Sequence, residues 1–191
     1  MTNQATNKER FLNIVNNVAP QRKGVDKLMG WLDGTDFFTA PASTRFHGAY
    51  EGGLLEHSLD VYDAFQRLFG ADNDPQDSVV ICTLFHDICK VGFYTVEMRN
   101  RKNERGQWEQ VPFYTVKDEF PYGHGEKSVF LIERFIRLKN EEAMAIRWHM
   151  GGYDEAVKGG SYAISDAYTK YPLAPKLHIA DLYATHLMGR E

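Results

Sequence analysis

The sequence predicts an all-α helical bundle with one inserted β-hairpin at about residues 93–116. Apolar residues recur at helical spacing through most of the 191-residue chain, whereas two short segments in its middle are rich in aromatic and β-branched residues. Hydrophobic residues make up 43% of the chain and charged residues 25%, as is usual for a globular protein. The length suits one hydrophobic core, so we expect residues 1–191 to form a single domain.

The N-terminal part of the chain predicts two helices and a loop. Residues 8–18 and 22–32 have amphipathic patterns typical of short helices. Residues 33–52 are rich in Gly, Pro, Thr and Ser, which favours a loop. We therefore interpret residues 1–45 as an N-terminal segment of helices and loop.

Two clear helices follow this loop. Apolar residues recur at helical spacing over residues 54–69, and Gly70 ends that helix. Asp74 has the residue type of an N-cap, and Pro75 suits a first helical turn. The apolar pattern then continues, so we expect the second helix to run to about Lys90.

Residues 93–98 (FYTVEM) and 108–116 (WEQVPFYTV) predict two paired strands. The charged segment NRKNERGQ lies between them and predicts the turn, and Pro112 indicates an edge position. At strand spacing the aromatic residues of the second strand are expected to pack against the bundle; the alternative is a surface on which nucleotide bases stack. These residues are Trp108, Phe113 and Tyr114.

Helical periodicity resumes after the hairpin. Residues 126–139 and 141–149 predict two helices that are split near Asn140, and a Gly-rich segment follows at 150–160. A last apolar helix is expected over residues 174–188.

Composition and charge exclude several classes of protein. No apolar run approaches the roughly 20 residues that a membrane-spanning helix needs, and the first ten residues are polar, unlike a signal peptide. The net charge of −4 argues against binding to long duplex DNA or to a membrane surface. Cys82 and Cys89 fall on one predicted helix at about 10 Å, too far apart for a disulfide. We therefore expect a cytoplasmic protein with free thiols.

The most informative motif is FHDICK, in which His86 and Asp87 stand side by side near the end of an apolar helix. Adjacent helical residues point about 100° apart, so the two cannot both face solvent if the helix is buried. A buried carboxylate without a partner is costly, and a metal ion would remove that cost. His86 and Asp87 are therefore candidate metal ligands.

Two other predicted helices carry further candidate ligands. His57 lies on an apolar helix face, and Asp181 lies within the apolar last helix. A lone histidine of this kind is more often a hydrogen-bonded core residue. Taken together with His86 and Asp87, however, the two match the way helix bundles build metal sites from side chains that project inward.

Two histidines stand beside glycines at predicted helix ends. His124 begins one helix and His149 ends another, and the neighbouring glycines allow close approach of the backbone to a site. Helix capping and turn formation are the alternative interpretation of both.

The order of these residues, H…HD…H…H…D, resembles the HD-domain metal-dependent phosphohydrolase superfamily over roughly residues 46–188. HDICK is similar to the family signature HD-[IL]-[GA]-K, with Cys89 at a position often held by a small residue. The segment FHGAYEGGLLEHSLDV resembles the first motif of HD hydrolases related to the HD-domain 3′–5′ exoribonucleases and to some relaxase-associated HD proteins. The GYP motif of the members that degrade cyclic di-GMP is missing, so that subgroup is not expected.

The resemblance implies an HD-domain helical bundle with a metal centre. In members with one ion, the ligands correspond to His57, His86, Asp87 and Asp181. In members with two ions, the aspartate of the HD pair bridges them, and the second ion is held by residues that correspond to His124 and His149. Because both histidines are present, we expect a binuclear centre. Mixed imidazole and carboxylate ligation suits Mn, Fe, Ni, Co or Zn, and the sequence does not choose among them.

Four residues are candidates for contacting a substrate. Lys90 lies one turn beyond His86 and would neutralise a phosphate oxygen, unless it is only a solvated helix end. His47 lies in the resembling first motif and would contact phosphate or protonate a leaving group; a loop hydrogen bond is the alternative. Lys127 occupies a first helical turn, where anions bind but surface lysines are common. Arg101 belongs to a basic hairpin tip that is either a solvated turn or a lid over a nucleotide or single strand.

We therefore expect a hydrolase that cleaves a phosphate ester of a nucleotide or of a short single-stranded nucleic acid, with Asp87, Lys90 and His47 as its catalytic residues. Three alternatives remain open from the sequence. They are a nucleotide-sensing module without turnover, a metal-stabilised structural adaptor and a di-iron oxygenase.

Overall fold

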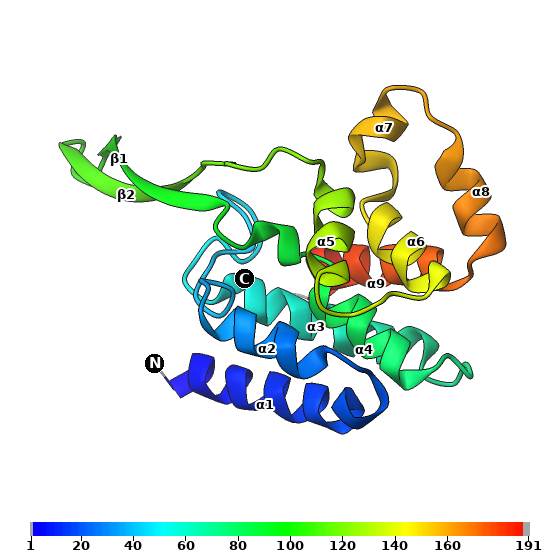
Figure 1. Ribbon diagram of the computed structural model, residues 1–191. Helices are drawn as coiled ribbons and strands as arrows, with labels where there is room; N and C mark the ends of the chain where they lie inside the picture. The colour runs from blue at the N-terminus through cyan, green and yellow to red at the C-terminus, as the bar shows by residue number, and fades with distance from the viewer. Residues whose placement is uncertain (1, 189–191) are drawn as a thin grey trace.

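A computed structural model describes residues 2–188 of the chain, and over this range helices predominate (Figure 1). The helices are α1 (Thr2–Val18), α2 (Val25–Asp33), α3 (Gly53–Phe69), α4 (Gln76–Phe85), α5 (His124–Glu133), α6 (Asn140–Trp148), α7 (Glu155–Lys158), α8 (Ala163–Lys170) and α9 (Leu173–Leu187). The strands are β1 (Tyr94–Lys102) and β2 (Trp108–Val116). The predicted helical bundle with an inserted hairpin is confirmed at this level.

Helix α3 lies in the middle of the bundle and contacts α1, α4 and α9. Helix α4 is buried over its length from Ser78 to Phe85, as expected for a helix that is apolar on all sides. In Figure 1, α1 and α2 run along one side of α3 and α4, and α5 to α8 lie on the other. Because α9 contacts both α3 and α6, it joins the two halves of the bundle.

Strands β1 and β2 form an antiparallel hairpin that extends away from the helices (Figure 1). Tyr94 pairs with Val116 at its base, and Lys102 pairs with Trp108 next to the turn. Strand β1 is longer than predicted, because residues 99–102 pair with β2 instead of belonging to the turn. The expectation that the aromatic residues pack against the bundle is wrong for Trp108, which is 69% exposed.

Several helix ends differ from the sequence prediction. Helix α1 begins earlier than residue 8, and α4 ends at Phe85 instead of continuing to Lys90, since the backbone leaves helical geometry at Asp87. A short 3-10 turn, Ile88–Lys90, follows. Asp74 is not the N-cap of α4: Pro75 holds that position, and the Asp74 carboxylate instead accepts a hydrogen bond from Lys176 at 2.6 Å.

The chain between the hairpin and the last helix also departs from the prediction. Residues 134–139 are not helical, so α5 is shorter than expected and ends further from α6, whereas α6 has the expected length. Helix α8 is an element that the sequence prediction lacked. Both cysteines are buried and free, as expected. Within residues 2–188, no helix combines the length and the apolar character needed to cross a bilayer.

Candidate metal centre and adjoining pocket

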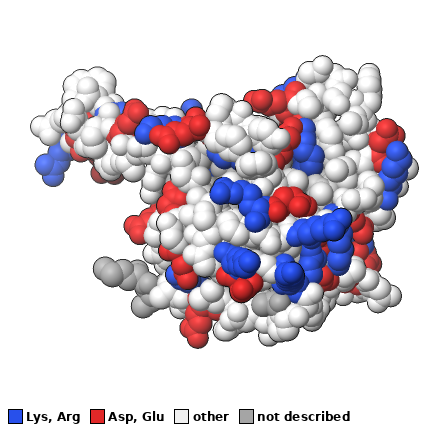
Figure 2. All heavy atoms as spheres, viewed as in Figure 1, with Lys and Arg blue, Asp and Glu red and all other residues white. Residues whose placement is uncertain are grey.

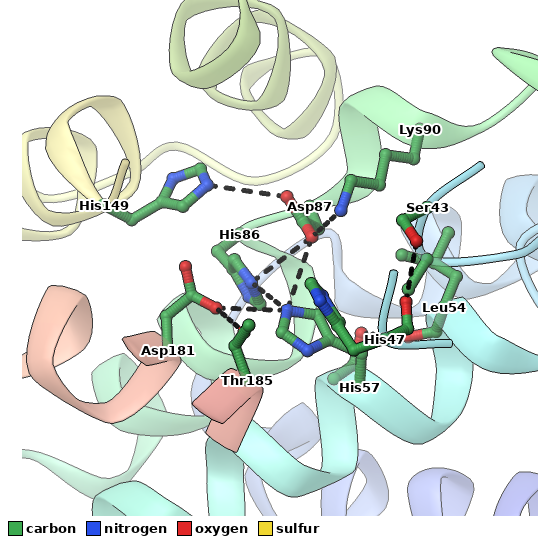
Figure 3. Close-up of polar contacts among 12 residues, drawn as sticks. Ser43, His47, Leu54, His57, His86, Asp87, Lys90, His149, Asp181 and Thr185 are labelled. Carbon is green, nitrogen blue, oxygen red and sulfur yellow. Dashed lines mark hydrogen bonds and ion pairs between the residues drawn. The ribbon is translucent and has the colours of Figure 1, made fainter. Parts of the chain in front are cut away.

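The structure brings together, at one point in the bundle, the six side chains that the sequence marks as candidate ligands. Figure 3 labels His57, His86, Asp87, His149 and Asp181 among them. Helices α3, α5 and α9 each contribute one, the end of α6 contributes one, and the end of α4 contributes two. They are His57, His124, Asp181, His149, His86 and Asp87.

The first group of potential ligand atoms lies around His57. Its Nε2 atom is 3.3 Å from Nε2 of His86 and 3.2 Å from Oδ1 of Asp181. Oδ2 of Asp87 lies 3.5 Å from the same His57 nitrogen and 3.6 Å from Nε2 of His86. Two imidazoles and two carboxylates thus point toward a common centre.

The second group lies on the other side of Asp87. Its Oδ1 atom is 2.7 Å from Nε2 of His124 and 3.5 Å from Nε2 of His149. The two oxygens of Asp87 therefore face two different pairs of histidines. This is the arrangement that a carboxylate needs in order to bridge two ions.

Helix ends fix the orientation of two of the imidazole rings. His86 follows α4, and its Nδ1 lies 2.9 Å from the carbonyl oxygen of Thr83. His149 follows α6, and its Nδ1 lies 2.6 Å from the carbonyl oxygen of Ile146. Carbonyls in a last helical turn lack helical partners and are free to accept these N–H groups. With Nδ1 protonated, the Nε2 lone pair of each ring faces the centre, as metal ligation requires.

Two glycines let neighbouring backbones approach the site closely. A Cβ atom on Gly53 would lie 2.0 Å from the carbonyl oxygen of Gly48, so only glycine allows the loop that carries His47 to rest on the start of α3. A Cβ atom on Gly125 would lie 2.2 Å from the carbonyl oxygen of Arg147. This contact brings the start of α5, and hence His124, against the end of α6.

The residues present fit a divalent metal. Nε2 of His149 is buried and makes no hydrogen bond within the described part of the chain, which is costly for a polar atom unless a ligand engages it. Burial lowers the pKa of His86 to about 3, which keeps its imidazole neutral and able to ligate. Burial raises the pKa of Asp87, but Lys90 and His86 outweigh that effect and lower it well below its ordinary value.

Lys90 and His47 border the candidate metal centre (Figure 3). Nζ of Lys90 donates to Oδ2 of Asp87 at 2.6 Å, and this carboxylate raises the pKa of Lys90 although burial opposes the change. The ring of His47 lies 5.0 Å from that of His57, measured between centroids. Burial, with the charges of His57 and Lys90, lowers the pKa of His47 to about 4, so its imidazole is neutral near pH 7.

A pocket of about 440 Å³ opens beside the centre, and His124 and Lys90 belong to its lining. Lys127 also lines this pocket, where its Nζ donates to Oδ1 of Asp118 at 2.7 Å. Arg101 does not line it. This exposed residue stands near the turn of the hairpin, opposite Glu109. Of the predicted substrate contacts, Lys90, His47 and Lys127 thus lie near the centre, and Arg101 lies apart from them.

Sequence reasoning missed two residues that contribute to the site region. Oγ1 of Thr185 lies 3.4 Å from Oδ1 of Asp181, and the spacing of one helical turn between them is a signal that would have pointed to it. Asp118 lines the pocket from the segment between β2 and α5. No periodicity or motif marks that segment, so its sequence gave no comparable signal.

Comparisons with known proteins agree with this geometry. Residues 54–185 match the family model described as HD domain, and all six candidate ligands lie inside that range. The chain is 36% identical, over 58 residues, to a protein of Methanocaldococcus jannaschii named dihydroneopterin 2′,3′-cyclic phosphate phosphodiesterase. The alignment covers 27% of this chain and 23% of that relative, so the chain spans about a quarter of the relative's length. No solved structure matches the chain.

Proposed function

Because the chain belongs to the HD domain family, we propose that it is a metal-dependent hydrolase that cleaves a phosphate ester of a nucleotide or of a short single-stranded nucleic acid. The observation that carries the proposal is the convergence of four histidines and two aspartates from five helical segments on one buried centre. Such clusters hold the metal ions of hydrolytic enzymes.

We propose that the six side chains hold two divalent transition metal ions. His57, His86 and Asp181 would surround one ion, His124 and His149 the other, with Asp87 shared between them; the division of the Asp87 oxygens supports this assignment. When bound, two such ions polarise a phosphoryl oxygen and lower the pKa of a coordinated water, which supplies hydroxide near neutral pH. Mn, Fe, Ni, Co and Zn all suit the donor set.

Two side chains of the site would act on the phosphate group itself. Lys90 belongs to the lining of the pocket next to Asp87, so its ammonium group can neutralise charge that develops on a phosphate oxygen. His47 is neutral near pH 7 and would donate a hydrogen bond to the phosphate from its ring N–H. Both lie close to the proposed metal ligands, Lys90 at Asp87 and His47 beside His57.

The dimensions and charge of the surface favour a small substrate. A pocket of about 440 Å³ lies in the range of roughly 300–1,000 Å³ typical of sites for small molecules. In the view of Figure 2, basic side chains gather at the lower right with acidic side chains at their border, and they do not form a continuous stripe across this face of the kind that tracks a long nucleic acid. The name of the archaeal relative adds 2′,3′-cyclic phosphates to the bond types worth testing.

A panel of phosphate esters with Mn²⁺ tests this function. It would contain nucleoside mono- and triphosphates, 2′,3′- and 3′,5′-cyclic nucleotides and short single-stranded oligonucleotides, and each reaction would be followed by product analysis. We expect turnover of one bond class that is lost in Asp87→Ala and retained in Asp166→Ala, which removes an exposed carboxylate. Absence of turnover with every suitable metal, at full metal occupancy, would contradict the proposal and favour a sensing or oxidative role.

A further inference from the structure

The pocket beside the metal centre, here called the side pocket, is lined by two chemically different sets of residues. His124 and Lys90 belong to the proposed catalytic site. Asp118, Phe93 and Tyr153 belong to the same lining but lie outside the proposed ligand set. A molecule whose phosphate lies at the metal centre and whose remaining part fills the side pocket would therefore meet these three residues.

Asp118 is held as a fixed hydrogen-bond acceptor. Its Oδ1 atom accepts hydrogen bonds from Nζ of Lys127 at 2.7 Å and from the backbone N–H of Phe120 at 3.0 Å. Burial raises the pKa of the Asp118 carboxyl, but the hydrogen bond from Lys127 outweighs it and lowers the pKa. An ionised carboxylate offers about four lone-pair positions and no donor. Two of them are engaged at Oδ1, and Oδ2 accepts no hydrogen bond from any described residue.

Lys127 holds this carboxylate in place. It is only 7% exposed, its ammonium group is paired with Asp118, and it lies 5.3 Å from the centre of the Phe93 ring and 5.9 Å from that of Phe120. The ion pair and the two rings hold both charged groups in place. Oδ2 of Asp118 therefore belongs to a carboxylate whose position is fixed.

Aromatic side chains also line the side pocket. Phe93 and Tyr153 are both part of the lining, and Tyr153 is 61% exposed, so its ring has surface available to a ligand. Flat heterocycles bind well against such rings, because every base has a π-face to stack. An acceptor-only group beside aromatic surface favours a heterocycle whose edge carries N–H donors.

We propose that the side pocket binds the base of the substrate nucleotide, and that Asp118 selects an edge with a ring N–H beside an exocyclic amino group. The inference rests on the proposed function, since the metal centre would hold the phosphate while the side pocket holds the base. Guanine presents both donors to a carboxylate. Hypoxanthine presents only the ring N–H, and adenine places a ring-nitrogen lone pair there, which the carboxylate repels.

Equilibrium binding of GMP, IMP and AMP, measured by calorimetry, tests the inference. A chelator in the buffer removes metal ions, so binding is measured without turnover. We expect GMP to bind at least about tenfold more tightly than AMP, with IMP between them. Tenfold is about what a single hydrogen bond to a charged group contributes, so it is the lower limit for the two donors of guanine in a partly exposed site. Asp118→Asn should reduce the ratio of GMP to AMP affinity to about twofold or less. Glu155→Gln makes the same charge change in the same lining and should leave the ratio unchanged.

Equal affinities for the three nucleotides in the wild-type protein would overturn the inference, and so would a GMP preference that survives in Asp118→Asn. The wild-type series decides the question even if Asp118→Asn does not fold. The result is also separable from the hydrolase proposal. If the metal-loaded enzyme hydrolyses phosphate esters of guanosine and adenosine with equal kcat/KM, the proposed hydrolase function stands and the proposed base selection is refuted. If GMP binds in an Asp118-dependent way but no metal supports turnover, base selection stands and the hydrolase function is refuted.

Discussion

The contact between Lys90 and Asp87 allows a quantitative test of how charge is balanced in the site. Nζ of Lys90 lies 2.6 Å from Oδ2 of Asp87, and the two side chains are 12% and 4% exposed. Removing one partner of a buried pair costs about 3–5 kcal/mol, because the other charge is left buried. Lys90 borders a pocket and can reach water, so we expect Asp87→Asn to cost about 2–3 kcal/mol of unfolding free energy.

Removing the lysine of the pair should lower the unfolding free energy by a smaller amount. Lys90→Met leaves Asp87 with its 2.7 Å contact to His124, so we expect a loss of about 1–2 kcal/mol. The double variant removes both charges and should lose about as much as Lys90→Met alone, so the coupling free energy equals the Asp87→Asn loss of about 2–3 kcal/mol. Urea denaturation of the four proteins in a chelator measures this quantity. Single losses that add to within about 0.5 kcal/mol would refute the reasoning.

Three further predictions follow from the site and its surroundings. Metal analysis after dialysis should find that Asp87→Ala loses both proposed ions and His149→Ala only one; two ions retained in Asp87→Ala would reject the bridging role. Burial raises the pKa of Glu142, but the hydrogen bond from Arg22 outweighs this effect and lowers the pKa below 4.5. The pair therefore stabilises the fold above pH 4.5, and its contribution to the unfolding free energy decreases as the pH falls below that value. The stability difference between wild type and Glu142→Gln, about 3 kcal/mol near pH 7, should therefore shrink by pH 3.5, and a constant difference in urea denaturation would contradict this. Trp108→Ser should change the unfolding free energy by less than about 0.5 kcal/mol, because the side chain is 69% exposed; a larger loss would show that it packs.

The candidate ligands could be predicted from the sequence because each one stands out in its local pattern. His57 and Asp181 interrupt apolar helix faces, and His86 and Asp87 stand together at the end of an apolar helix. Polar groups at such positions need partners, and partners from several helices can meet only inside the bundle. The periodicity that defines α3 predicted its bounds to within one residue, since nearly every turn of it is buried on one face.

Other features depend on contacts that no local pattern encodes. Trp108 has the composition of a packed strand residue, yet the hairpin projects from the bundle and leaves the ring beside Lys102. Asp118 is defined by its ion pair with Lys127, which joins an irregular segment to the next helix. The end of α4 is set by the hydrogen bond of His86 to Thr83 and by the turn at Asp87, so the requirements of the site override the helical pattern there.

The contact between His57 and Asp181 links the opposite ends of the family-matched stretch at 3.2 Å. Closing a loop of so many residues costs conformational entropy. The packing of α9 against α3 offsets this cost. A chain in which α9 has not docked lacks one carboxylate of the cluster, even if every other helix has formed. Capture of an ion that uses Asp181 would therefore report the docking of α9, and its binding free energy would stabilise this non-local contact.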